Sequence, residues 1–147
     1  NFKDLYGEIS FNSKAKVIYN DTYNILNNSN RALVTSGTAT LETAFFNVPQ
    51  VVVYKTSWVS YLIAKTLVKI KYISLVNLIM NKEVVKELIQ NDLSVLNLTN
   101  ELIKFDDSLA LNKMQEDYQL LIAKCQGDNV SKNIATDMFK TIDSFQK

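Results

Sequence analysis

The order of apolar and polar positions along the first half of the chain predicts strands that alternate with helices. Short β-branched or aromatic runs at Val17–Tyr19, Ala32–Thr35 and Gln50–Tyr54 are typical of strands. The last of these is a Val-rich run, the pattern of a strand that is buried on both faces of a parallel sheet and is therefore central in it. Between and after the runs, the spacing predicts helices over about Thr22–Leu26 and from about Thr38 onward.

The remainder of the chain is predicted to be mainly helical. Tyr72–Leu75 has the composition of one more short strand, and Val76–Met80 has the length of a single helical turn. Apolar residues recur at helical spacing from Glu83 onward, and the helices expected there are Val84–Gln90, Val95–Phe105, Leu109–Lys124 and Ser131–Phe145. Repeated strand–helix–strand units followed by helices predict the α/β class, as a Rossmann-like doubly wound parallel sheet with a helical C-terminal third.

Composition and charge limit the functions that this chain can have. Its 147 residues, of which 47% are hydrophobic, suit a single domain over residues 1–147. The 16 basic and 15 acidic residues leave a net charge of +1, so no general attraction to nucleic acid or to an anionic membrane is expected. One cysteine and no histidine predict a reducing compartment, no internal disulfide and no metal site. The chain begins without Met or an apolar signal-peptide core, so we interpret its start as that of a fragment.

The stretch Trp58–Ile73 comes nearest to a membrane span. It is shorter than the ~20 residues that a span needs and is interrupted by Lys65, Lys69 and Lys71, so no transmembrane helix is predicted. Its mixture of aromatic residues, leucines and lysines would suit a helix that lies on a membrane surface. A helix over Trp58–Ile70 that is apolar on nearly all sides fits packing in the core or between domains better.

The turn Thr35–Thr38 is the first candidate for ligand binding. Ligands of parallel α/β sheets lie beyond the carboxyl ends of the strands, and this turn joins such a strand end to a helix. Gly37 permits a tight turn, and the free N–H groups of the first helical turn favour a phosphate. Hydroxyl donors are expected from Ser36, Thr38 and Thr40. Glu42, one turn into the helix, is a carboxylate acceptor that suits the hydroxyl groups of a ribose.

A simpler interpretation of the same residues stays open. A Ser or Thr before a helix, with a Glu in its first turn, is a common capping signature, so Thr38 and Glu42 could serve the helix alone. The turn lacks the Gly-Lys-Ser/Thr of a Walker A loop and the three glycines of a dinucleotide-binding loop, so neither an ATPase nor a dehydrogenase is supported. Asp106 and Asp107 also precede a predicted helix, and we interpret them as its cap rather than as a catalytic pair.

Three segments resemble the C-terminal domain of the lipid-A-disaccharide synthases: SGTATLETAFFNVPQVVVYKTS, SYLIAKTLVKIKYISLVNLI and KEVVKELIQ. The resemblance covers about Ala32–Gln90 and continues more weakly on both sides. That family belongs to the GT-B glycosyltransferases, in which two Rossmann-like domains face one another and the C-terminal one binds the nucleotide diphosphate. The resemblance therefore implies that this chain is a UDP-sugar-binding domain.

The resemblance also implies site residues and a reaction. Ser36, Gly37 and Thr38 would contact the diphosphate, Glu42 the ribose, and Asn77 would line the sugar-donor pocket. The implied enzyme joins the glucosamine of UDP-2,3-diacylglucosamine to 2,3-diacylglucosamine 1-phosphate, with inversion and release of UDP, in lipid A biosynthesis. No cofactor is implied. The absence of an Asp-x-Asp sequence fits an enzyme that stabilises its leaving group without a metal.

Several properties of the implied enzyme depend on regions other than this chain. In this family the general base and much of the lipid-acceptor surface belong to the N-terminal domain, so this chain alone is predicted to bind UDP weakly and to be inactive. The implied location is the cytoplasm of a Gram-negative bacterium, with peripheral association with the inner membrane. The chain departs from the usual family pattern at Asn47, Lys55 and Lys86. A lysine at position 55 in place of arginine loses bidentate phosphate geometry.

The predicted last helix has an apolar face that must be buried against something. The face carries Ile134, Met138, Ile142 and Phe145 at helical spacing. In GT-B enzymes the last helix crosses back to the other domain. Here it could also pack on its own sheet or exchange with a second chain, which would give a homodimer.

Two other functions are compatible with parts of the pattern. One is a domain of another GT-B glycosyltransferase or of a UDP-sugar epimerase, which share a strand, a Ser-Gly-Thr turn, a helix and a Glu. The other is a non-catalytic partner-binding domain, such as one like a response-regulator receiver. A receiver needs an acidic cluster at the strand ends, and the predicted strands Ala32–Thr35 and Val51–Tyr54 offer none.

Overall fold

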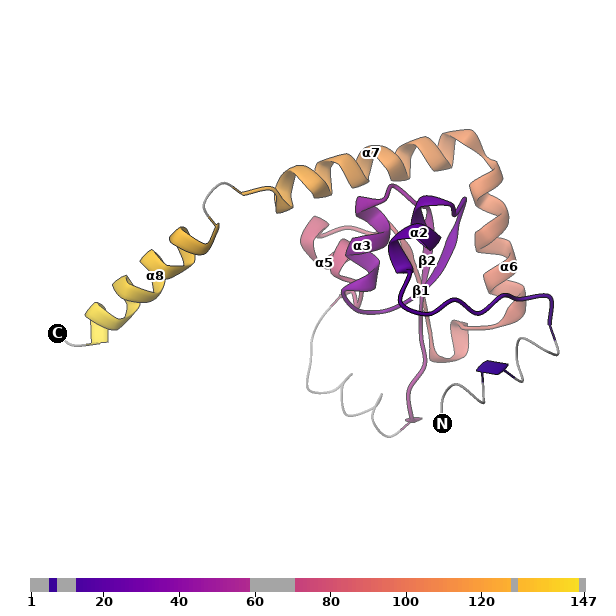
Figure 1. Ribbon diagram of the computed structural model, residues 1–147, viewed down its shortest axis with the longest axis horizontal. Coiled ribbons are helices and arrows are strands. Elements are labelled where there is room, and N and C mark those ends of the chain that lie inside the picture. Colours follow the sequence, from indigo (N-terminus) through magenta and orange to yellow (C-terminus); the bar gives the residue numbers. More distant parts are fainter. Residues whose placement is uncertain (1–5, 8–12, 59–70, 128–129, 146–147) are drawn as a thin grey trace.

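The computed structural model of the chain describes residues 6–7, 13–58, 71–127 and 130–145 (Figure 1). Its helices (α), strands (β) and 3-10 turns (η) follow one another in a fixed order along the chain. They are α2 (Thr22–Asn27), β1 (Ala32–Thr35), α3 (Ala39–Phe45), β2 (Gln50–Tyr54), α5 (Leu75–Met80), β3 (Lys86–Ile89), η1 (Gln90–Asp92), α6 (Val95–Ile103), η2 (Lys104–Asp106), α7 (Ser108–Cys125) and α8 (Val130–Phe145).

The strands form a parallel sheet in the order β1-β2-β3, with β2 between the other two. Val52 of β2 pairs with Val34 on one side and with Glu87 on the other. Val51 and Val52 are fully buried, as expected for a strand that is covered on both faces. The predicted α/β class with a parallel sheet is confirmed, and so is the central position of the Val-rich strand.

Three helices bury the main core against β2. Helices α3, α5 and α7 pack against one another, and α6 lies beside β2 and β3. The apolar cluster between them consists of Ala44, Val52, Val76, Met80, Val84, Val85, Tyr118 and Leu121. Helix α7 runs across the starts of the strands, as Figure 1 shows, so the opposite, carboxyl edge of the sheet is not covered by it.

A buried polar group links α7 to α3. The side-chain amide of Gln50, at the start of β2, donates to the carbonyl of Thr40 at 2.9 Å and to the hydroxyl of Tyr118 at 3.3 Å. All three residues are fully buried. Burial raises the pKa of Tyr118 well above its usual value, so the phenol stays neutral. The contact therefore fixes how α7 lies on α3 without burying a charge.

Three predicted elements are wrong. Val17–Tyr19 is not a strand, because the described sheet ends at β1 and no strand lies next to it to pair with these residues. Tyr72–Leu75 is not a strand either, since Ser74 caps α5 and the helix begins at Leu75. The predicted helix Val84–Gln90 is instead strand β3 followed by a 3-10 turn.

The misplaced helix has a physical explanation. Val84 and Val85 donate their backbone N–H groups to the side-chain oxygen of Asn77, at 2.8 and 3.0 Å, which holds the chain that leads into β3 against α5. Residues Lys86–Ile89 then pair with β2. The run Val84–Gln90 begins with two β-branched valines and contains Leu88 and Ile89, so it suits a strand as well as a helix, and the neighbouring strand β2 decides between them.

The remaining predicted helices are close to the observed ones. The helix expected from about Thr38 is α3, the turn at Val76–Met80 is α5, and α7 spans Ser108–Cys125. Asp107 accepts from the backbone N–H of Leu109 at 3.0 Å, so its predicted capping role is confirmed. The unusual Asn47 follows α3 with a φ of 57°, a conformation that Asn tolerates better than most residues.

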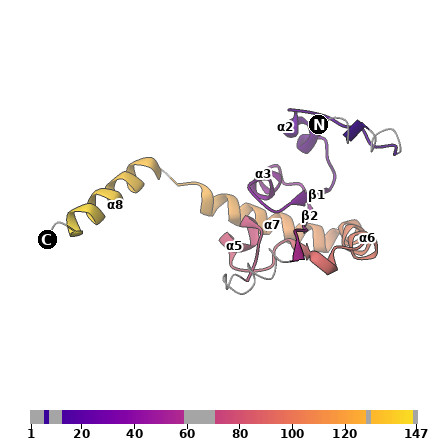
Figure 2. The ribbon, with the colours of Figure 1, turned by 90° about the horizontal axis from the view of Figure 1, so that it is seen from below.

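Helix α8 extends away from the rest of the molecule (Figures 1 and 2). The predicted apolar face is exposed: 53% for Ile134, 63% for Met138 and 54% for Ile142. The helix therefore does not pack on its own sheet, one of the three positions considered from the sequence. The predicted helix at Trp58–Ile70 lies outside the described residues beyond Trp58. Within the described ranges, no helix has the length and apolar character to cross a membrane.

Candidate functional site

The turn Thr35–Thr38, called here the glycine loop, lies where β1 ends at the carboxyl edge of the sheet and leads into α3. The backbone N–H of Ser36 donates to the carbonyl of Val53 at 3.2 Å, which keeps the loop attached to β2. Gly37 has a φ of 150°, outside the range that L side chains readily adopt. An added Cβ there would meet no atom within 4 Å, so the backbone conformation, rather than crowding, requires the glycine.

The backbone of the glycine loop leaves several hydrogen-bond donors unused. Thr40 and Leu41 donate to carbonyls of the loop, at Gly37 and Thr38. The N–H groups of Gly37, Thr38 and Ala39 make no hydrogen bond within the described part of the chain. Thr38 occupies the cap position of α3, and its side chain makes no capping hydrogen bond. This start of α3 is therefore an open set of N–H donors that an anion can satisfy.

The hydroxyl groups near the loop differ in their availability. Thr38 is exposed. The hydroxyl of Ser36 donates to the carbonyl of Ile73 at 2.8 Å, so a ligand would have to replace that contact or use the oxygen as an acceptor. Thr40 is fully buried, and its hydroxyl donates to the carbonyl of Gly37 at 2.8 Å. The expectation that Thr40 offers a hydroxyl to a ligand is therefore wrong.

Glu42 lies further along α3 and is partly buried. It lines a hollow of about 320 Å³ together with Asn20, Asp21, Thr22 and Tyr23, which lead into α2. The side chains that line the hollow include both hydrogen-bond donors and hydrogen-bond acceptors. Recognition of a sugar with several hydroxyl groups requires both. Glu42 thus opens onto a polar space that it shares with the start of α2.

Asn77, which the resemblance implies to line the sugar-donor pocket, hydrogen-bonds to residues at the start of β3. The residue is fully buried on α5. Its amide group donates to the carbonyl of Val85 at 2.8 Å and to Glu87 at 2.9 Å. Its oxygen accepts the two N–H groups of Val84 and Val85. The side chain therefore has no unused hydrogen-bonding capacity in this structure, and its place in the sugar-donor pocket stays a prediction.

Glu87 is the site-region residue that sequence reasoning missed. Its carboxylate, on β3, accepts the backbone N–H groups of Ile73 at 3.0 Å and Ser74 at 2.9 Å, besides the amide of Asn77. Ile73 in turn accepts from Ser36. Because a helix was predicted over Val84–Gln90, Glu87 was not identified as a residue of the site region. A helical Glu87 would not lie beside β2. A strand assignment would have placed it in the first half of β3, paired with Val52 of the central strand.

The loops after β2 and β3 are joined at the same edge. The side-chain amide of Gln90 accepts from the backbone N–H of Thr56 at 2.8 Å and donates to its carbonyl at 3.1 Å. Gln90 holds this position with a φ of 51°, an uncommon conformation for a residue with a side chain. Lys55, whose role the sequence left in doubt, is exposed between β2 and Thr56. The edge thus has a fixed backbone, and Lys55 is an exposed cation in the loop that follows β2.

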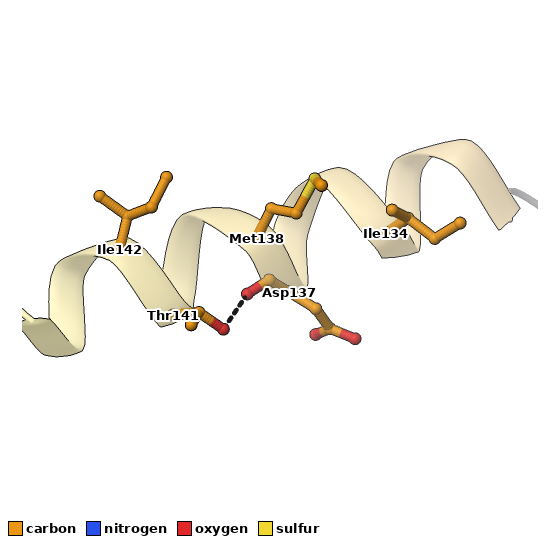
Figure 3. A pocket seen from close by; sticks show the side chains of 5 residues that line it. All are labelled: Ile134, Asp137, Met138, Thr141 and Ile142. Carbon is orange, nitrogen blue, oxygen red and sulfur yellow. Dashed lines mark hydrogen bonds between the residues drawn. The ribbon is translucent and has the colours of Figure 1, made fainter. Parts of the chain in front are cut away.

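A second hollow, of about 510 Å³, lies on α8 and is not a candidate binding site. Figure 3 shows that its lining residues all project from this one helix: Ile134, Asp137, Met138, Thr141 and Ile142. Among the residues that the structure describes, no other element lines the space. Within the described ranges, no group of three acidic or cysteine side chains is placed to hold a metal ion.

Comparison with known proteins matches these residues to one family. The profile of the family described as lipid-A-disaccharide synthetase matches residues 2–139. A lipid-A-disaccharide synthase of Sulfurihydrogenibium sp. (strain YO3AOP1) is 35% identical over 123 residues, which are 84% of this chain and 32% of that protein. One of Psychromonas ingrahamii is 38% identical over 117 residues, 78% of this chain and 30% of that protein. One of Anaeromyxobacter sp. (strain K) is 43% identical over 81 residues, 55% of this chain and 21% of that protein. The chain spans about a third of the length of the first two relatives.

Proposed function

Because this chain belongs to the lipid-A-disaccharide synthetase family, we propose that it is the domain that binds the UDP part of a sugar donor. The observation that carries the proposal is the uncapped start of α3. Three N–H groups, of Gly37, Thr38 and Ala39, are unused there, and the side chain of Thr38 does not cap them. A diphosphate would satisfy these donors.

Glu42 is proposed to accept hydroxyl groups of the ribose. It follows the glycine loop on α3 and borders the polar hollow at residues 20–23. With the diphosphate on the loop, the nucleoside would extend towards Glu42, and a carboxylate there would distinguish a ribose from a deoxyribose. Asn77 would contribute indirectly, by holding the start of β3 in place.

The whole enzyme is proposed to be an inverting GT-B glycosyltransferase. It would join UDP-2,3-diacylglucosamine to 2,3-diacylglucosamine 1-phosphate in lipid A biosynthesis, and UDP would leave from the glycine loop. N–H donors that are already oriented stabilise the charge that develops on a leaving diphosphate, so no metal ion is needed for this step. We propose that the general base and the lipid-acceptor surface lie in sequence beyond these residues, and that the enzyme works in the cytoplasm at the inner membrane.

Family membership favours this function over the two alternatives. A UDP-sugar epimerase and a receiver-like partner-binding domain would both be compatible with a parallel sheet alone. The family match extends over residues 2–139 and includes the glycine loop, Glu42 and β3. A homodimer or an interdomain contact through α8 is a further proposal, for which the exposed Ile134, Met138 and Ile142 provide the apolar surface.

Calorimetric titrations of three nucleotides would test the proposed binding mode. UDP should bind more tightly than UMP, because the second phosphate adds contacts with the glycine loop, and more tightly than dUDP, because Glu42 accepts a ribose hydroxyl. Glu42→Ala should remove the preference for UDP over dUDP and keep the preference over UMP. Glu116→Ala, an exposed glutamate on α7, is the control. Absence of UDP binding, or an unchanged preference in Glu42→Ala, would contradict the proposal.

A further inference from the structure

A continuous set of hydrogen bonds connects β3 with the glycine loop. Glu87 accepts the N–H groups of Ile73 and Ser74 with its two carboxylate oxygens, at 3.0 and 2.9 Å. The carbonyl of the same Ile73 accepts from the hydroxyl of Ser36, at 2.8 Å. Two residues that are far apart in sequence, Ser36 and Glu87, thus hold opposite sides of one peptide segment.

We propose that Glu87 is a positioning residue of the nucleotide site. It holds the Ile73–Ser74 segment against Ser36, and this contact sets the orientation of Ser36 and of the Gly37 and Thr38 N–H groups that follow it. The inference rests on the proposed function, since it assigns Glu87 a role in the binding of a nucleoside diphosphate at the glycine loop. Glu87 itself makes no contact with the ligand in this proposal.

The surroundings of Glu87 explain why a carboxylate is needed there. Three donors converge on it: two backbone N–H groups and the side-chain amide of Asn77, which shares one of the two oxygens. A glutamine has only one acceptor oxygen, so its NH₂ group would face a backbone N–H at Ile73 or Ser74. One donor would be left unpaired in a partly buried place, and the segment would move away.

Asn77 fixes the other side of Glu87. Its amide donates to Glu87 while its oxygen accepts the N–H groups of Val84 and Val85, and it is fully buried. This arrangement leaves the carboxylate little freedom to rotate, so its position is transmitted to Ile73. Coupling between Glu87 and Ser36 is then expected to be energetic as well as geometric, because one segment lies between them.

A double-mutant cycle with Glu87→Gln and Ser36→Ala tests the proposal on the protein at its natural length. UDP affinity is measured by calorimetry well below the unfolding temperature of each variant. We expect Glu87→Gln to weaken UDP binding about tenfold, because the segment that orients Ser36 loses one of its charge-assisted hydrogen bonds. In the double variant the two losses should not add, because the effect of Glu87 passes through the contact between Ile73 and Ser36. Additive losses, or unchanged affinity in Glu87→Gln, would overturn the proposal.

Two further measurements separate this role from general stability and from the proposed function. Glu83→Gln removes the same charge just before β3, where the glutamate pairs with exposed Lys86 at 2.9 Å, and should leave UDP affinity unchanged. Amide hydrogen exchange should be faster at Ile73 and Ser74 in Glu87→Gln without any ligand present. Faster exchange combined with no UDP binding by the parent protein would overturn the proposed function and the nucleotide part of this inference. Unchanged exchange would overturn the inference while leaving UDP binding by the parent protein intact.

Discussion

Helix α3 and the later helices begin in different ways. Helices α5, α6 and α7 each have a cap residue whose side chain accepts a backbone N–H of the first helical turn. These cap residues are Ser74, Ser94 and Asp107. Helix α3 starts at Thr38 without such a bond. Helix α2 also lacks one, but the carboxylate of its cap residue Asp21 accepts from the side chain of Asn24 at 2.6 Å. The comparison shows that hydroxyl and carboxyl residues before a helix can serve either the helix or a ligand, and that the hydrogen bonds distinguish the two.

This difference bears on the simpler interpretation of the sequence. A Ser or Thr before a helix with a Glu in its first turn predicts a self-contained cap. The structure has no side-chain cap at Thr38 and leaves the N–H groups of Gly37 and Ala39 unused. Capping therefore does not account for the glycine loop, whereas it fully accounts for Asp107. Substitutions at the two kinds of helix start should have opposite effects on ligand binding and on stability.

The largest effect is expected from Gly37→Val. A β-branched residue does not adopt a φ of 150°, so the loop must change its path and its N–H groups turn away. We expect UDP affinity to fall about 100-fold in calorimetric titration, which corresponds to about 3 kcal/mol of strain and lost contacts. Gly7→Val, at a glycine without positive φ, is the control and should bind UDP normally. Normal affinity in Gly37→Val would show that the loop conformation is not needed.

Thr38→Asp should convert α3 into a helix that resembles α7. The carboxylate would cap the first-turn N–H groups and would repel the diphosphate. We expect UDP affinity to fall at least about tenfold while the melting temperature stays the same or rises. Tighter binding of UDP, or a loss of stability, would mean that these N–H groups already have another role. Ser94→Asp at the start of α6 provides the matched substitution at a helix start that is already capped.

Asp107→Ala should affect stability alone. The carboxylate accepts from Leu109 at the start of α7, and loss of such a cap costs about 1 kcal/mol in the free energy of unfolding. Urea denaturation followed by circular dichroism measures this change, with Ser108→Ala as the neighbouring control. UDP affinity of the folded protein should not change. A lower UDP affinity of the fully folded Asp107→Ala variant would contradict the distinction between the two kinds of helix start.

The smallest effect is expected from Thr38→Val, which removes one exposed hydroxyl and keeps the shape of the side chain. UDP affinity should fall about threefold, as for one solvent-accessible hydrogen bond, and stability should stay the same. Thr99→Val on α6, whose hydroxyl donates to Val95 at 2.9 Å, serves as the control without an effect on binding. A clear loss of stability in Thr38→Val would indicate that Thr38 caps α3 after all.

The local sequence correctly predicted those elements in which the hydrophobic pattern agrees with the strand pairing of the sheet. The runs Ala32–Thr35 and Gln50–Tyr54 are strands at the predicted residues, and the glycine loop lies at the predicted strand end. The helical prediction failed at Val84–Gln90, because β2 is available for pairing with Lys86–Ile89, and Asn77 holds the two residues that lead into this strand. Such long-range contacts have no signature in a window of ten residues.

The candidate site was predictable to the same extent. Ser36, Gly37, Thr38 and Glu42 are neighbours in sequence, so one strand end and one helix bring them together. Glu87 and Gln90 reach the site edge only through the order of strands in the sheet, and Asn77 turns inward because two N–H groups need its oxygen. The sequence-based role of Asn77 as a pocket residue came from the family resemblance, which does not say which way a side chain points.

The buried hydrogen bond between Gln50 and Tyr118 should restrict which residues occur together at these two positions in the family. Loss of the phenol would leave one N–H of the Gln50 amide unpaired in the core, and loss of Gln50 would remove the hydrogen-bond partner of the fully buried Tyr118 hydroxyl. Either change alone should lower the free energy of unfolding, so the two positions are expected to covary among relatives. A lineage with phenylalanine at position 118 should carry an apolar or smaller residue at position 50, with α7 displaced slightly towards the sheet.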